Sequence, residues 1–156
     1  MWVPVQRKTI DMVLHHHRER SERDAQAAAG GVNVSPSVER VISSPRIVTK
    51  PWGQELIFAH TPEYAGKILY VTAGHRLSLQ YHEQKHETVY VRRGLIRATI
   101  ATNDGALEQV KLYPGDALNV RAGRIHRFEA IEDSELFEVS TPELSDVVRI
   151  SDDYGR

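Results

Sequence analysis

From about residue 46 to its end, the chain is predicted to be all-β, either a two-sheet sandwich or a barrel. Short runs rich in Val, Ile, Leu, Tyr and Phe recur there at close, regular spacing. Gly, Pro, Asn and Asp residues, which favour turns, separate these runs. Many short strands divided by such turns are typical of sandwiches and barrels. A length of 156 residues allows a single domain with a real core.

The first 45 residues differ in composition and are expected to be an N-terminal extension and linker, with the domain at 46–156. Residues 5–29 are charged and Ala-rich and lack Gly, Pro4 suits a first helical turn, and Gly30-Gly31 forms a stop. We therefore expect a short helix that packs weakly, or a flexible segment, because its apolar residues are few. Residues 32–45 are typical of a linker, with an edge strand at 38–42 as an alternative.

Ten strands are expected after the linker, and 103–105, Asn-Asp-Gly, is the clearest hairpin turn. The other turns centre on Gly74, 92–94, 114–116, Gly123 and 132–134. The predicted strands are 54–59, 67–73, 77–82, 87–92, 94–102, 106–111, 117–120, 126–131, 134–140 and 147–150.

The segment 74–94 has the spacing of a metal site on a β-hairpin. Gln80 and His82 are two residues apart, so they point to the same face of a strand. Glu87 can face them from the returning strand, and His126, which opens a strand after the turn at Gly123, can supply a fourth ligand. Two imidazoles, one carboxylate and one amide oxygen suit Zn²⁺, Mn²⁺, Fe²⁺ or Ni²⁺.

These intervals resemble the two motifs of the cupin superfamily. Gln80 stands where the first motif has its first His, and Arg121 stands where the second motif has Pro. The matching positions are Gly74, Gln80, His82, Glu87 and Gly94 in the first motif, and Gly115, Gly123 and His126 in the second. The resemblance implies a jelly-roll barrel, also called a double-stranded β-helix.

Within that superfamily, the chain resembles the C-terminal cupin domain of type II mannose-6-phosphate isomerases. The similar blocks are 50–53, 64–67, 77–82 and 141–149. The resemblance implies zinc and aldose–ketose isomerisation of a phosphorylated sugar. Its upstream nucleotidyltransferase domain has no counterpart in the first 45 residues.

For such a reaction, His75 and Glu129 are candidates for the catalytic base, and several cations are candidates for phosphate binding. The phosphate candidates are Lys67, Arg76, Arg121, Arg124 and Arg149. Two alternatives remain open. Two His and one carboxylate also serve non-haem iron oxygenases that act on small organic substrates, and a metal-holding cupin can bind a sugar without catalysis.

Composition limits the other functions. The chain has no Cys, which excludes thiolate ligands, and a formal net charge of −1, which gives no long-range attraction for nucleic acid or anionic membranes. No apolar run is long enough to span a bilayer, so we expect a cytoplasmic protein. Exposed strand edges favour pairing, so we expect a homodimer with 38–58 at the contact.

Overall fold

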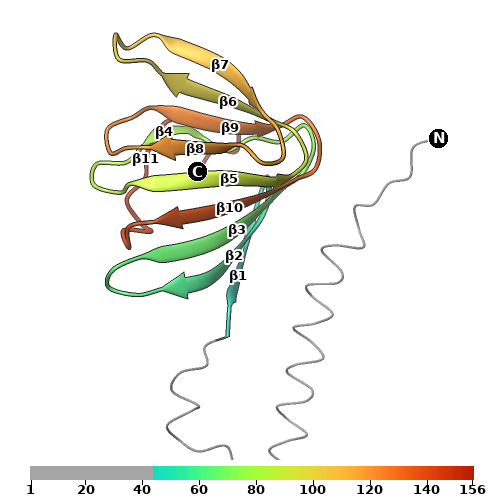
Figure 1. The fold of residues 1–156 in the computed structure, drawn as a ribbon, viewed down its shortest axis with the longest axis vertical. Coiled ribbons are helices and arrows are strands. Elements are labelled where there is room, and N and C mark those ends of the chain that lie inside the picture. Colours follow the sequence, from blue (N-terminus) through green and yellow to red (C-terminus); the bar gives the residue numbers. More distant parts are fainter. Residues whose placement is uncertain (1–43) are drawn as a thin grey trace, which may run out of the picture. The chain divides into compact units, whose positions relative to one another are not determined.

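The computed structural model describes residues 44–156, which fold as two antiparallel sheets without a helix (Figure 1). The strands are β1 (Arg46–Lys50), β2 (Gly53–His60), β3 (Ala65–Val71), β4 (Leu79–Tyr81), β5 (Glu87–Arg93), β6 (Ile96–Ala101), β7 (Leu107–Leu112), β8 (Ala117–Val120), β9 (His126–Ala130), β10 (Ser134–Ser140) and β11 (Val148–Ser151). The all-β jelly-roll prediction is confirmed. Within residues 44–156, no helix is long and apolar enough to cross a membrane.

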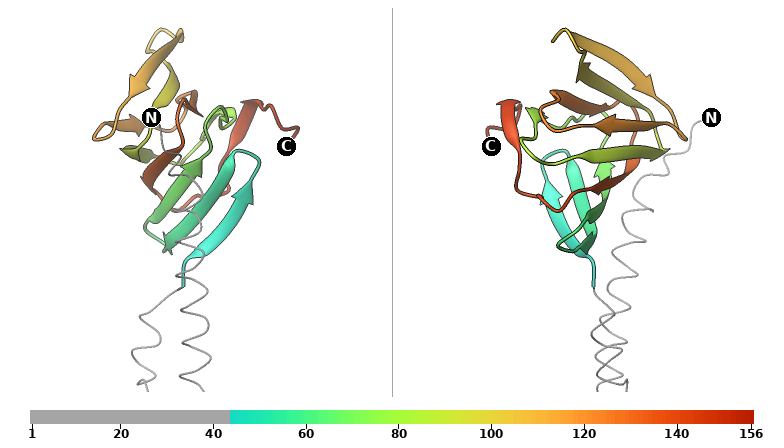
Figure 2. Two further views of the ribbon diagram at one scale, coloured as in Figure 1. Left: turned by 90° about the vertical axis from the view of Figure 1, so that its right-hand side faces the viewer. Right: turned by 60° about the vertical axis from the view of Figure 1, so that its left-hand side comes forward.

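One sheet has six strands in the order β1-β2-β3-β10-β5-β8, and the other has five in the order β11-β4-β9-β6-β7. Figure 2 shows β1 and β2 at one end of the fold and β6 and β7 at the other. In the middle of the larger sheet, β10 pairs with β3 on one side and with β5 on the other. Strands distant in sequence are therefore neighbours, and β10 lies beside the first motif.

Strand alternation places one face of each sheet in the core. Val89 and Val91 of β5 are buried, and Phe128 and Ala130 of β9 are buried in the same way. Glu87 lies two residues before Val89, and His126 lies two residues before Phe128. The period of two therefore carries both polar side chains to the interior side, one from each sheet.

The turn at Gly94 explains the last position of the first motif. Its φ of 86° is a left-handed conformation that favours glycine. A Cβ there would also lie 2.3 Å from Ser134 Oγ and 2.5 Å from Asp133 O. Any larger residue would therefore push β5 away from the turn that precedes β10.

The predicted strands correspond to β2–β11, although β4 is shorter than the expected 77–82. The sequence patterns left β1 unassigned, because its five residues lie between prolines and include Arg46 and Lys50. Among residues 44–156, it is an edge strand whose only partner is β2. The expected helix at 5–29 and edge strand at 38–42 lie outside the described residues, and the domain boundary at 45 stays a prediction.

Candidate metal centre

Three buried side chains form the cluster that the motif spacing predicts. His82 directly follows β4, Glu87 opens β5 and His126 opens β9. Their exposed fractions are 0%, 6% and 1%. One ligand-type atom from each lies within 4.8 Å of the others, so a single ion between them could contact all three.

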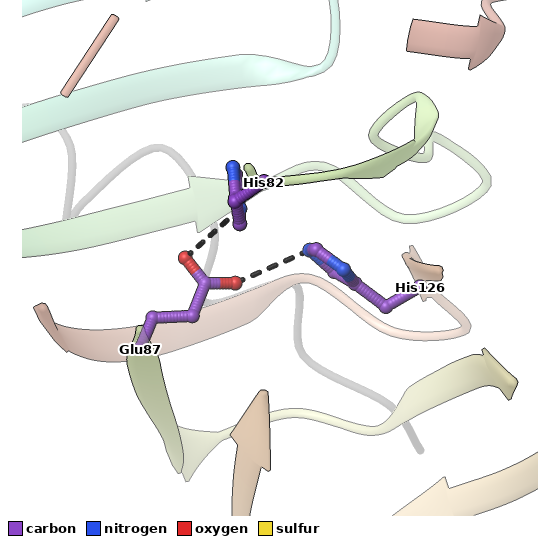
Figure 3. Close-up of side chains that lie close together, drawn as sticks. All are labelled: His82, Glu87 and His126. Carbon is purple, nitrogen blue, oxygen red and sulfur yellow. Dashed lines mark ion pairs between the residues drawn. The ribbon is translucent and has the colours of Figure 1, made fainter. Parts of the chain in front are cut away.

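The carboxylate of Glu87 lies between the two imidazoles (Figure 3). Its Oε1 is 3.2 Å from His126 Nε2, and its Oε2 is 3.5 Å from His82 Nε2. The two rings are tilted by 47°, with centroids 5.1 Å apart. Both Nε2 atoms are buried, and neither makes a hydrogen bond with any described residue.

The backbone selects the tautomer of each ring. His82 Nδ1 faces the carbonyl oxygen of Asp146, and His126 Nδ1 lies 2.9 Å from the carbonyl oxygen of Arg124. A carbonyl only accepts hydrogen bonds, so both Nδ1 atoms carry the proton, and in a neutral ring Nε2 keeps a bare lone pair. Beside a carboxylate, each Nε2 needs either a proton or a bound cation, and one divalent metal between the rings meets that need for both.

Gln80, the predicted fourth ligand, lies beside the cluster. It is the cross-strand partner of His126 and lines the same cavity as Glu87 and His126. The hydroxyl of Ser78 donates to Gln80 Oε1 at 2.6 Å. This bond fixes the amide and leaves a second lone pair on the same oxygen, which can contact a metal.

Asp146 binds the turn that connects β4 to β5. Its carboxylate accepts backbone N–H bonds from Glu83 at 3.0 Å, Gln84 at 2.7 Å and Lys85 at 2.8 Å. These bonds lower the pKa of Asp146 to about 2. The carbonyl of Asp146 also holds His82 Nδ1, so this single residue, two positions before β11, positions both the ligand and the turn. Sequence spacing gave no signal for this contact.

Lys85 was also missed, because it stands in a segment that has the composition of a polar turn. Its ammonium is buried and lies 2.5 Å from Glu87 Oε2. Burial alone would raise the pKa of Glu87, but His126, His82 and Lys85 outweigh it and hold the pKa well below its usual value. Glu87 is therefore an ionised ligand candidate with a built-in counter-ion.

The cluster opens into a cavity of about 360 Å³ with a strongly cationic lining. Trp52, Leu69 and Phe128 give it an apolar wall. The charged lining residues are the cations Arg46, Lys50, Lys67, Lys85, Arg149 and Arg156 and the carboxylates Glu55, Glu87 and Glu138. Cations outnumber carboxylates six to three in this lining, and a positive excess that favours anionic ligands remains after Arg156 is paired with Asp152.

Of the five phosphate candidates, two line the cavity and three do not. Lys67 and Arg149 line it. Arg76 pairs with Asp153, and Arg124 donates to the carbonyl of Ala101 and to Asn103. Arg121 lines a separate groove beside His86 and Thr88. A sequence does not distinguish an arginine that lines a cavity from one on the surface, so the five candidates could not be ranked from sequence.

The structure does not bring the two base candidates to the cavity. His75 lies in the turn after β3, where its ring contacts the carbonyl of Ala73. Glu129 alternates with the inward-facing residues of β9 and pairs with Arg97 at 3.0 Å. Neither side chain lines the cavity or belongs to the His82–Glu87–His126 cluster.

Among solved structures, the fold is similar to several cupin proteins. KdgF from a Halomonas species is 24% identical, with a TM-score of 0.56 over 67% of this chain and 92% of that chain. A single-residue variant of the oxalate decarboxylase of Bacillus subtilis is 18% identical, with a TM-score of 0.62 over 69% of this chain and 30% of that one. CapF, a capsular polysaccharide assembling protein of Staphylococcus aureus, is 14% identical, with a TM-score of 0.59 over 75% of this chain and 35% of that one. At these identities the likeness shows the fold alone.

A comparison with curated protein sequences finds no significant match. A family model described as mannose-6-phosphate isomerase C-terminal matches residues 39–152. The match includes every ligand candidate and leaves out residues 1–38 and the last four residues of the chain. The chain therefore belongs to the mannose-6-phosphate isomerase C-terminal family of cupin-type domains.

Proposed function

We propose that the protein is a metal-dependent isomerase that interconverts a phosphorylated aldose and ketose, with mannose 6-phosphate as the model substrate. The observation that carries this proposal is the pair of buried, unpartnered Nε2 atoms that face Glu87 at the base of a cationic cavity. The family match supports the choice of a sugar phosphate.

Four residues would hold the metal: His82 and His126 through Nε2, Glu87 through its carboxylate and Gln80 through its amide oxygen. With one carboxylate, such a site keeps a net charge of about +1, which polarises a bound carbonyl and stabilises an enediolate. We propose zinc from the family resemblance. Manganese, iron and nickel also suit this donor set.

The rest of the cavity would bind and orient the sugar. The cations of its wall favour a phosphate, and Arg149, the cross-strand partner of Gln80, lies beside the ligand strand. Lys67 is the second predicted phosphate contact in the cavity. Trp52 and Phe128 offer apolar surface to the sugar ring, as is common in carbohydrate and small-molecule sites.

An iron-dependent oxygenase is the second candidate, because the buried cluster contains two His and one carboxylate. A non-catalytic sugar-binding module is the third, and it finds support in the fold likeness to the polysaccharide assembling protein CapF. The fold likeness to an oxalate decarboxylase with Mn(II) centres makes manganese a further outcome to test.

Elemental analysis of untagged protein, followed by an assay of mannose 6-phosphate against fructose 6-phosphate, separates these candidates. Stoichiometric zinc with interconversion supports the isomerase, and iron with substrate-dependent oxygen uptake supports the oxygenase. Metal with sugar binding but no turnover supports the binding module. Gln80→His should retain metal, because His is the commoner ligand at this position of the cupin motif, and should change the turnover rate. An unchanged turnover rate would show that the Gln80 amide has no special role in the reaction.

We also propose that the protein is cytoplasmic and forms a homodimer through residues 38–58. Within the described part of this segment, β1 is the free edge of the larger sheet. Edge strands of this kind favour pairing with a second copy. Light scattering at micromolar concentration tests the dimer, and a monomer would contradict it.

A further inference from the structure

A second charged cluster lies beside the candidate metal ligands. It consists of Lys67 in β3, Glu138 in β10 and Lys85 in the turn before β5, with exposed fractions of 7%, 4% and 2%. Glu138 Oε1 lies 3.2 Å from Lys67 Nζ and 3.2 Å from Lys85 Nζ. All three side chains line the cavity.

These charges occupy positions where apolar residues would fit. Lys67 pairs across the sheet with Glu138 on one side and with Ile57 on the other, and Glu138 pairs on its other side with Val89. Across the sheet, Lys67 and Glu138 therefore stand between two buried aliphatic residues, Ile57 and Val89. Because burying ions costs free energy that apolar side chains avoid, stability alone does not account for this cluster.

The arrangement directs one oxygen of Glu138 toward the lysines and keeps the other out of both ion pairs. Both ammonium contacts use Oε1. Lys85 also contacts Glu87 Oε2, so a single ammonium links Glu138 to a candidate metal ligand.

We propose that Glu138 is the base that moves the proton between C1 and C2 of the sugar. This inference rests on the proposed isomerase function. A sugar held by O1 and O2 at the Glu87 cluster would have its reacting carbons on the same side of the cavity as Glu138. The other carboxylates that line the cavity are Glu87, which is a ligand candidate, and Glu55, which pairs with Lys50 of the edge strand β1, whereas Glu138 shares Lys85 with Glu87.

The proton balance needs no other reactant. Glu138 takes the proton from C2 of the aldose, the C2–H electron pair forms the C1–C2 double bond, and the C1 carbonyl oxygen takes the negative charge. The O2 hydroxyl proton passes to O1, and C2–O2 becomes the new carbonyl as the double bond returns its electrons to C1. Glu138 then gives its proton to C1, which leaves the ketose and a regenerated carboxylate.

The test uses full-length, metal-loaded protein with mannose 6-phosphate in D₂O, followed by proton NMR. Wild type should form the ketose and incorporate deuterium. Glu138→Gln should keep its metal content and lose at least about a hundredfold in rate, which is a typical contribution of a general base. Glu135→Gln is the matched control, since it changes a buried glutamate of the same strand that pairs with Arg92 and does not line the cavity.

Because Glu138→Gln leaves two ammoniums without their shared carboxylate, Glu138→Asp is the second variant. It keeps the charge but withdraws the carboxylate by one methylene, and its rate should fall at least about tenfold. A folded, metal-loaded Glu138→Gln or Glu138→Asp protein with the wild-type rate would overturn the assignment of the base alone. A metal-loaded wild type that neither converts nor exchanges the sugar would overturn the isomerase function, and the inference with it.

Discussion

Replacing Lys85 by Met should destabilise the metal-free protein strongly. Lys85 is 2% exposed and lies 2.5 Å from Glu87 and 3.2 Å from Glu138. Removing it leaves Glu87 without an ammonium partner and Glu138 with Lys67 alone. Breaking a buried ion pair in this way costs about 3–5 kcal/mol in the free energy of unfolding. For a domain of this size, that loss corresponds to a fall in Tm of roughly 10 °C or more.

Metal should offset part of this loss. A divalent ion at the cluster supplies a positive charge opposite Glu87, so the variant should regain part of the lost free energy when zinc is saturating. By linkage, Lys85→Met should bind zinc more tightly than wild type, because the ammonium no longer competes for Glu87 Oε2. Urea unfolding with zinc and with a chelator measures both quantities.

The control is Lys111→Met, which changes an exposed lysine of β7. Its effect should stay within about 0.5 kcal/mol, as for ordinary surface substitutions. A loss below about 1 kcal/mol for Lys85→Met in chelator, or an equal loss with and without zinc, would refute the claim that this ammonium is the counter-ion of the metal-free cluster.

Three further outcomes are expected. His82→Ala and His126→Ala should each abolish stoichiometric metal in elemental analysis, since a lost ligand typically costs several kcal/mol of binding, and full occupancy in both would refute the site. Arg156 lowers the pKa of Asp152 to about 2, so this pair should stabilise the fold above pH 3.8 and less as the pH falls toward 2. Asp152→Asn should flatten the dependence of Tm on pH in that window. An unchanged dependence would show that the Asp152–Arg156 ion pair does not contribute to stability. Removal of residues 1–31 should preserve metal stoichiometry and a cooperative thermal melt. Loss of either would show that the domain begins before residue 46.

The ligand cluster could be predicted from sequence because its geometry is mostly local. A period of two places Gln80 and His82 on one face, and the turns at Gly94 and Gly123 fix where the next strands begin. The structure brings His82, Glu87 and His126 together as that spacing indicates. The strands were predictable for the same reason, whereas β1, with its charges and flanking prolines, showed no such pattern.

The rest of the site depends on partners far away in sequence. Asp146 holds a turn more than 60 residues before it, and Glu138 reaches Lys85 over 53 residues. Lys85 has the composition of a solvated turn residue, and only the placement of β10 beside β3 and β5 buries it. No local pattern separates such a lysine from one on the surface, so Lys85 and Glu138 were not found, although Lys67 and Arg149 of the same cavity were among the candidates.

The cluster is assembled by the packing of the two sheets. Glu87 belongs to the six-stranded sheet and His126 to the five-stranded sheet, so their contact exists only when the interior faces meet. Phe128, two residues beyond His126, has its ring centroid 5.7 Å from that of His126 and is part of the hydrophobic core. The free energy that packs the core therefore also brings the ligands together, and a metal held by both sheets would in turn stabilise their packing. This reciprocity explains why a charged cluster that is costly by itself can persist inside an otherwise apolar jelly roll.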